Sequence, residues 1–160
     1  MGKITRYFHL GLTLVSWLIF AVGLGYLLTQ WKTIPDEIGV HFDQNGKFDI
    51  SDSKIFAFYP CTTNFILLVV LETACFVCKK IKSDLKISAE SENKIKAVLL
   101  IFVDISKIII SSFFTYWIFC VVLQNDLNTN VAGVCLGIIA VLFLLFITYL
   151  LHIKMKAKKN

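Results

Sequence analysis

The chain has 160 residues, of which 57% are hydrophobic, with a mean hydropathy of +0.74 and a formal net charge of +5. Soluble domains are nearer half apolar and do not gather apolar residues into spans of about 20. A soluble helical bundle is excluded because its helices need polar stripes, and the length leaves room for one four-helix membrane domain over residues 1–160.

The first apolar run covers residues 7–30 and follows two basic residues, Lys3 and Arg6. A secretory signal peptide also begins with basic residues, but its apolar core is only about 7–15 residues long and precedes a small-residue cleavage site. This run is longer, and no such site follows it. We expect a retained membrane helix with Trp31 at its outer boundary, where aromatic residues gather. Three glycines of this region suit close helix packing: Gly11, Gly23 and Gly25.

Residues 31–58 form the longest polar segment, and their Asn45-Gly46 pair is a strong hairpin signal. A three-residue loop over 44–46 segregates apolar from polar residues, whereas a two-residue loop mixes them on each face. It also places Gly46 at the left-handed position that such loops need. We therefore expect an outer β-hairpin with the following cross-strand pairs: Phe42 with Phe48, Val40 with Ile50, and His41 with Asp49 on the other face.

The same segment carries the pattern I-P-D-E-I-x-x-H-F-x-x-x-G-x-x-D-x-x-x-S-K, followed by a proline. The matching residues are Pro35, Asp36, Ile38, His41, Phe42, Gly46, Asp49, Ser53, Lys54 and Pro60. This pattern resembles the family known as domain of unknown function 1648, although Gly39 stands where that family usually has a second proline. The family includes the N-terminal part of the immunity protein against the sporulation-delaying toxin. The resemblance implies a membrane protein, in some members one of toxin immunity, and no established chemistry.

The outer segment is therefore a candidate surface for a partner, either a peptide toxin or another membrane protein. Its candidate binding residues are His41, Phe42, Asp43, Gly46, Asp49 and Lys54. The alternative is that the carboxylates only cap turns and the His41/Asp49 pair only steadies the strands. A calcium loop over 41–52 is disfavoured, because His41 stands where an oxygen ligand is needed and Asp52 where glutamate is usual. One histidine with no nearby cysteine also argues against zinc there.

Three further apolar runs cover residues 59–78, 97–123 and 131–153. Pro60 suits the first turn of the second helix. The polar connection 79–96 is expected to form a helical extension or a loop, and 124–130 a short turn. The expected fold is therefore all-α and integral to the membrane, with four transmembrane helices and a short extracytoplasmic β-hairpin between the first two.

The basic residues give the expected orientation, because cytoplasmic segments are enriched in Lys and Arg. Three of the sixteen flank the membrane on the hairpin side, and Lys107 lies inside an apolar run. The other twelve lie on the opposite side: Lys3, Arg6, Lys79, Lys80, Lys82, Lys86, Lys94, Lys96, Lys154, Lys156, Lys158 and Lys159. We expect a plasma-membrane protein with both termini cytoplasmic. We therefore interpret the net positive charge as a signal of membrane topology. Nucleic-acid binding is not expected, because the basic residues are not carried by a soluble domain.

Three ionisable residues lie inside the apolar runs: Glu72, Asp104 and Lys107. Such charges cost about 2.5–3.5 kcal/mol on insertion scales for Asp or Lys, so they usually pair and face the protein interior. Glu72 and Asp104 lie at similar depth, and Asp104 and Lys107 share a helix face. Two interpretations stay open. The cluster either fixes how the second and third helices pack, or it forms an ion or proton site.

The remaining chemistry-bearing residues give no site. His9 and His152 lie at the expected cytoplasmic helix ends and are interpreted as interfacial. The five cysteines form no framework, and Cys75-x-x-Cys78 on a helix is interpreted as packing. The sequence contains no phosphate-binding glycine loop, nucleophile elbow or metalloprotease helix. We expect no metal, no cofactor and no enzymatic activity.

The leading hypothesis is a non-catalytic, immunity-like membrane protein that recognises a partner through its outer segment. The inference from fold to this function rests on the family resemblance. One alternative is a small ion-coupled transporter that uses the three charges within the apolar runs. Another is an accessory or signalling subunit of a larger membrane complex. The lipid bilayer is a further expected partner.

The orientation can be tested with single cysteines at positions 47 and 86, in a background without the five native cysteines. The basic-residue bias predicts that position 47 faces outside and position 86 inside. A membrane-impermeant maleimide should therefore label intact cells at position 47 only. Labelling at position 86 but not at 47 overturns the topology.

Overall fold

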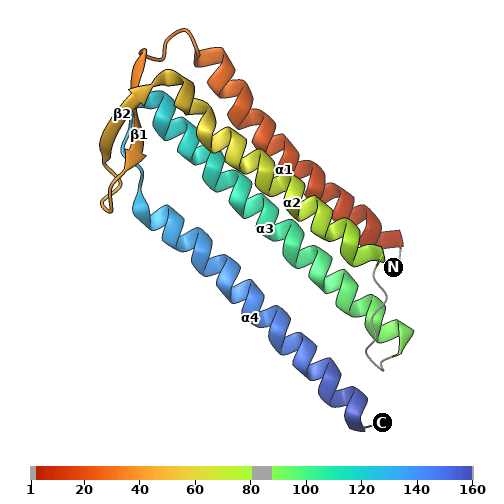
Figure 1. The fold of residues 1–160 in the computed structure, drawn as a ribbon. Helices are drawn as coiled ribbons and strands as arrows, with labels where there is room; N and C mark the ends of the chain where they lie inside the picture. Colours follow the sequence, from red (N-terminus) through yellow and green to blue (C-terminus); the bar gives the residue numbers. More distant parts are fainter. Residues whose placement is uncertain (1–2, 81–87, 160) are drawn as a thin grey trace.

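The computed structural model describes residues 3–80 and 88–159. Four long helices lie side by side, and a two-stranded sheet covers one end of them, whereas both chain termini lie at the other end (Figure 1). The elements, in chain order, are α1 (Lys3–Gln30), β1 (Glu37–Phe42), β2 (Phe48–Ser53), the 3-10 helix η1 (Lys54–Phe58), α2 (Tyr59–Lys80), α3 (Ala89–Leu123) and α4 (Thr129–Lys159). The hairpin lies between α1 and α2, as expected.

Each of the four helices includes a stretch long and apolar enough to cross a membrane. The helices nevertheless extend beyond the apolar runs, since α1 begins at Lys3 and α3 at Ala89. Ser88 caps α3 by accepting a hydrogen bond from the Ser91 amide, and two acidic residues in the first turn favour the helix dipole. Of the connection over 79–96, the part from Ala89 onward is therefore helical, while residues 81–87 lie outside the described part of the chain.

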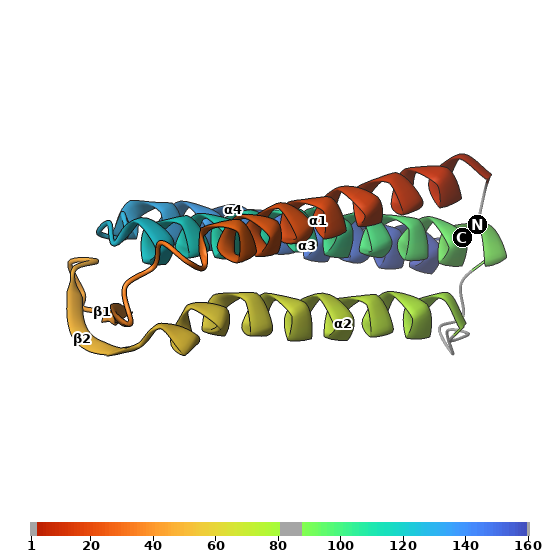
Figure 2. The same cartoon turned by 90° about the horizontal axis from the view of Figure 1, so that it is seen from above.

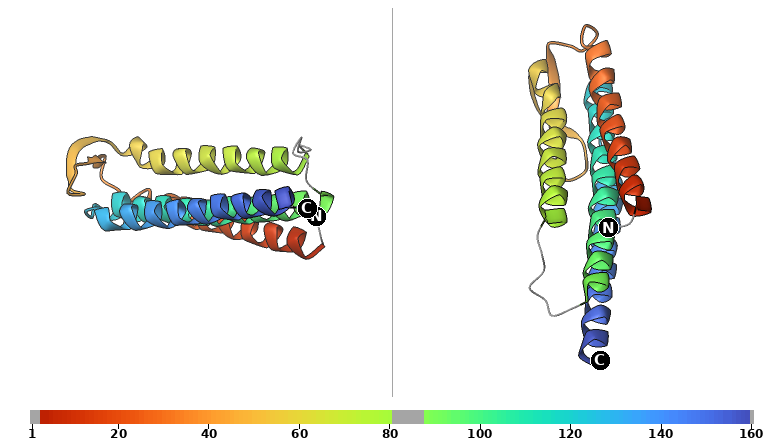
Figure 3. Two further views of the ribbon diagram at one scale, coloured as in Figure 1. Left: turned by 90° about the horizontal axis from the view of Figure 1, so that it is seen from below. Right: turned by 90° about the vertical axis from the view of Figure 1, so that its right-hand side faces the viewer.

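Helices α1, α2 and α3 form the core of the bundle, and α4 packs mainly along α3 (Figures 2 and 3). The apolar span of α4 contains no buried residue. Facing side chains of the first three helices therefore set the geometry of the interior. The fourth helix contributes little to it, although its sequence is the most apolar of the four spans.

Helices α1 and α3 pack closely at Gly23, where a Cβ atom would lie 2.9 Å from Thr115 Oγ1 and 3.0 Å from Ile118 Cδ1. The Thr115 hydroxyl also donates a 3.1 Å hydrogen bond to the Ile19 carbonyl oxygen. Small residues allow such approaches between membrane helices. Of the three glycines expected to serve packing, only Gly23 does so, because Gly11 and Gly25 face open space.

The turn of the hairpin is as predicted. Phe42 pairs with Phe48, their rings lie 4.2 Å apart, and Gly46 has a φ of 79°. The amide of Asp43 donates to the Lys47 carbonyl, which closes the three-residue loop.

Two of the three predicted pairings are wrong, Val40 with Ile50 and His41 with Asp49, because His41 lies opposite Ile50. The side chains of His41 and Asp49 nevertheless meet. The pairing register changes between Gly39 and His41 and changes back between His41 and Phe42. The irregularity is therefore confined to His41, and the register at Phe42 is again the predicted one. The physical reason is that β1 packs against α3 and η1, whereas β2 is exposed after Phe48. Ile38 is 1% exposed, whereas Ile50 on β2 is 53% exposed, so the apolar face does not continue across the sheet as expected.

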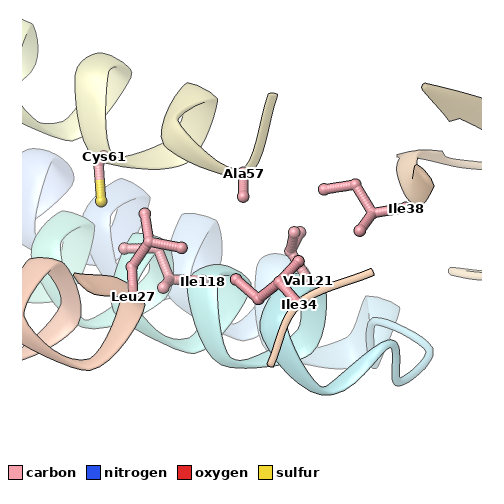
Figure 4. Packing of buried hydrophobic residues seen from close by; sticks show 7 residues of the cluster. All are labelled: Leu27, Ile34, Ile38, Ala57, Cys61, Ile118 and Val121. Atoms are coloured by element: carbon pink, nitrogen blue, oxygen red, sulfur yellow. The ribbon is translucent and has the colours of Figure 1, made fainter. Parts of the chain in front are cut away.

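A cluster of hydrophobic residues joins the hairpin to the helix ends (Figure 4). It combines residues from α1, β1, η1, α2 and α3 with one from the segment before β1: Leu27, Ile34, Ile38, Ala57, Cys61, Ile118 and Val121. Burial of the apolar side chains of this cluster stabilises the packing of the sheet against the helices. Cys61 takes part as a free thiol, and the other four cysteines are also free.

The close α1–α3 approach predicts that Gly23→Leu destabilises the protein by about 1–3 kcal/mol, as overpacking usually does. Gly25→Leu adds the same side chain two residues away, where nothing lies within 4 Å of the Cβ position. It should leave stability nearly unchanged. Denaturation in detergent micelles, followed by circular dichroism, measures both. Equal losses for the two variants would contradict the packing described here.

Candidate functional site

The hairpin is bound to the connection between α3 and α4 at two points. The Leu127 amide donates a 2.8 Å hydrogen bond to the Gly46 carbonyl, and the Gly39 amide donates a 2.9 Å bond to Gln124 Oε1. Gln124 ends α3 in a left-handed conformation, with φ of 50°. We call the hairpin and this connection, residues 37–53 and 124–128, the outer platform. Its two segments, distant in sequence, form one unit.

Two aspartates, one in the platform and one at its edge, make local hydrogen bonds that support it. Asp43 Oδ1 accepts hydrogen bonds from the backbone amides of Lys47 and Asn45, at 2.9 and 2.8 Å, and these bonds lower the pKa of its carboxyl group. Lys54 donates a 2.6 Å hydrogen bond to Asp36, which lowers the pKa of Asp36. Because the folded state lowers both pKa values, this support is present at neutral pH and is lost as the pH falls through the carboxyl range.

Four of the six candidate binding residues have structural roles in the platform or directly beside it. Phe42 packs against Phe48 and the hydrophobic cluster, and Asp43 and Gly46 form the turn. Lys54 pairs with Asp36 and lies over the Trp31 ring, 5.6 Å from its centroid.

His41 and Asp49 differ from those four, because they face outward. Their side chains are 60% and 43% exposed and meet through a 2.6 Å contact between His41 Nδ1 and Asp49 Oδ1, although the strand register places His41 opposite Ile50. Beside them, all of β2 after Phe48 is exposed. The surface available to a partner is therefore centred on His41, Asp49 and β2.

A second constellation lies toward the opposite end of the bundle. The Lys107 ammonium contacts Glu72 Oε1 at 2.6 Å, Asp104 Oδ1 at 2.8 Å and Thr13 Oγ1 at 2.9 Å. These residues come from α1, α2 and α3, so one buried cation joins three helices. Lys107 and Asp104 are fully buried. The three charges noted in the apolar runs are thus brought together.

His9 also belongs to this constellation, contrary to its interpretation as an interfacial residue. It is 7% exposed, and its Nδ1 atom lies 2.7 Å from Asp104 Oδ2. Its Nε2 atom lies 2.6 Å from the Lys79 ammonium. Lys79 can only donate, so Nε2 accepts and Nδ1–H donates to Asp104, which describes a neutral imidazole. The missed signal was periodicity, since His9, Thr13 and Ser16 share one face of α1.

We refer to His9, Thr13, Glu72, Lys79, Asp104 and Lys107 as the ion cluster. Two carboxylates face two ammonium groups around a neutral histidine, so the cluster carries no net charge. Each charged group has a partner of opposite charge or the histidine. This pairing offsets the cost of burying charge and makes the cluster a joint between helices.

Weaker polar contacts continue from the ion cluster toward the platform. Ser111 donates a 3.3 Å hydrogen bond to Asn64 Oδ1, and both residues are fully buried. Within the described residues, Asn64 Nδ2 is a buried nitrogen without a hydrogen-bond partner. Beyond Asn64 the interior is occupied by the hydrophobic cluster under the hairpin.

Comparison of the chain with family models, curated proteins and solved structures finds no match. The family resemblance of the outer segment therefore rests on its own residues.

The ion cluster predicts that Lys107→Met destabilises the protein by about 3–5 kcal/mol, because two carboxylates lose their buried cation. The double change Glu72→Gln/Lys107→Met should lose less than the single change, since it also removes one of the stranded charges. Lys94→Met, which breaks an exposed pair with Glu90 on the same helix, is the control and should have little effect. Additive losses in detergent melting would contradict the coupling.

Proposed function

We propose that this chain is a non-catalytic integral membrane protein whose outer platform recognises a partner outside the membrane. The pattern of its outer segment, which resembles the family that includes a toxin-immunity protein, supports a peptide toxin as that partner. The four long apolar helices support membrane insertion. The excess of basic residues at the ends opposite the hairpin supports cytoplasmic termini.

The observation that carries this proposal is the contrast between the two strands of the platform. β1 is packed on the helix ends, whereas β2 is exposed along its length after Phe48. A two-stranded ribbon is marginally stable by itself, yet this one is held by the hydrophobic cluster and by two hydrogen bonds to the α3–α4 connection. A rigid support with one exposed strand is a suitable surface for a peptide, because ordering costs on binding are small.

The ion cluster favours a second candidate, a small ion-coupled transporter. Buried ionisable residues in apolar helices commonly mark ion or proton pathways. Two features make this the weaker candidate. The charges are paired with one another, and the hydrophobic cluster separates them from the outer end of the bundle. The cluster serves the first function equally well by fixing the helices that carry the platform.

The experiment is a challenge of sensitive cells with peptides encoded beside the gene, with and without this protein. Gly46→Val should abolish protection, because Gly46 has a positive φ and any Cβ there would overlap the Leu127 carbonyl oxygen. Asn45→Ala, in the same turn but exposed, is the matched control. His41→Ala and Asp49→Ala should reduce protection at unchanged membrane levels if they touch the partner.

Asp104→Asn separates the two candidates. A recognition protein should keep its protection if this variant still folds, whereas an ion-coupled carrier should lose activity. Full protection by Gly46→Val and His41→Ala, together with loss in a well-folded Asp104→Asn variant, would replace recognition with transport.

A further inference from the structure

We propose that His9, Cys75 and Asp104 form a binding site for a divalent transition-metal ion of the zinc class. The three residues come from α1, α2 and α3 and are all buried. One donor atom of each, the histidine nitrogen, the thiol sulfur and a carboxylate oxygen, lies within 4.8 Å of the other two. This inference is independent of the proposed recognition function, because it concerns the other end of the bundle.

The donor set determines the class of ion. Zinc binds imidazole nitrogen, thiolate sulfur and carboxylate oxygen at about 2.0–2.3 Å, which places donors in a tetrahedral site roughly 3.3–3.8 Å apart. The observed separations are close enough for side-chain adjustment to reach such distances. Magnesium and calcium prefer oxygen ligands only, so a site with one sulfur and one nitrogen discriminates against them.

The surroundings of Asp104 already orient it for such a role. Its Oδ1 atom is contacted by Lys107 at 2.8 Å and by the Thr13 hydroxyl at 3.5 Å. Its Oδ2 atom is directed toward His9 Nδ1 instead. One carboxylate oxygen is thus held by hydrogen bonds, and the other faces the remaining ligands. Residues that hydrogen-bond to a metal-binding carboxylate commonly orient it in this way.

Lys79 competes with the metal. Its ammonium donates to His9 Nε2, which keeps the imidazole proton on Nδ1. Nδ1 is the nitrogen that faces the Asp104 carboxylate, and it serves as the metal ligand in the proposed site. Metal binding at Nδ1 moves that proton to Nε2 and requires Lys79, in the last turn of α2, to turn away. The Cys75 thiol releases one proton to water as the sulfur–metal bond forms, so binding should strengthen as the pH rises.

The charges around the ion are those of the ion cluster. Glu72 and Asp104 balance Lys79 and Lys107 before binding, and the Cys75 thiolate offsets one of the two charges of the ion. Withdrawal of Lys79 removes the nearest repulsive group from His9. Lys79 therefore weakens metal binding, because it competes with the ion for His9.

The test uses the full chain purified in detergent and titrated with Co²⁺, which shows a sulfur-to-cobalt charge-transfer absorption when a thiolate binds it. One equivalent should produce this absorption, and Zn²⁺ but not Mg²⁺ should displace the cobalt. Cys75→Ser should abolish the absorption, and His9→Ala should weaken binding at least about tenfold. Cys78→Ser, one turn away on α2, is the matched control and should retain it.

Lys79→Met provides the discriminating arm, because it should bind the ion more tightly than the unaltered protein, by about tenfold or more. If the contact between His9 and Lys79 were only structural, the Lys79→Met change would not increase the affinity for the metal ion. Metal-free melting curves of each variant report whether it is folded. Absence of the absorption in the folded, unaltered protein overturns the proposal, and so does its persistence in Cys75→Ser.

Discussion

The contact on which the bundle depends is the buried Lys107 ammonium between Glu72 and Asp104. An unpaired charge at this depth would cost several kcal/mol, so α2 and α3 must lie where the three groups can meet. Thr13 and His9 extend the same constraint to α1. In the bilayer that we propose for these helices, apolar contacts alone specify helix positions weakly, because lipid is as apolar as the helices. The ion cluster therefore supplies specificity that the hydrophobic residues do not.

The outer platform depends on this placement. The hydrophobic cluster beneath it includes residues from the ends of α1, α2 and α3. The sheet can therefore pack against the bundle only when these helix ends are correctly spaced. The α3–α4 connection then holds the hairpin at its tip and along β1. This explains why a short ribbon, unstable by itself, can present His41 and Asp49 in a fixed orientation.

The sequence predicted the local elements and the partnership of the charges within the apolar runs, and it missed the other contacts between distant segments. Hydropathy located four helices, and Asn45-Gly46 located the turn with its left-handed glycine. The charges within apolar runs marked Glu72, Asp104 and Lys107 as partners. The pairing of Val40 with Ile50 failed because alternation alone does not show that β2 lies off the bundle.

Contacts between remote segments gave no comparable signal. His9 meets Asp104 across 95 positions of the sequence, and Gly39 meets Gln124 across 85. No short-range pattern encodes such separations. The face shared by His9, Thr13 and Ser16 was the one available clue, and it indicates a buried polar stripe without naming its partner.

The most direct test of recognition by the platform is site-specific photo-crosslinking during a challenge with the peptides encoded beside the gene. A photoreactive residue would replace Ile50 on β2 or, as a control apolar residue that is even more exposed, Leu136 on α4. The account predicts a peptide adduct at position 50 and none at position 136. Protection of the cells without any adduct at position 50, or with adducts at position 136 alone, would contradict it.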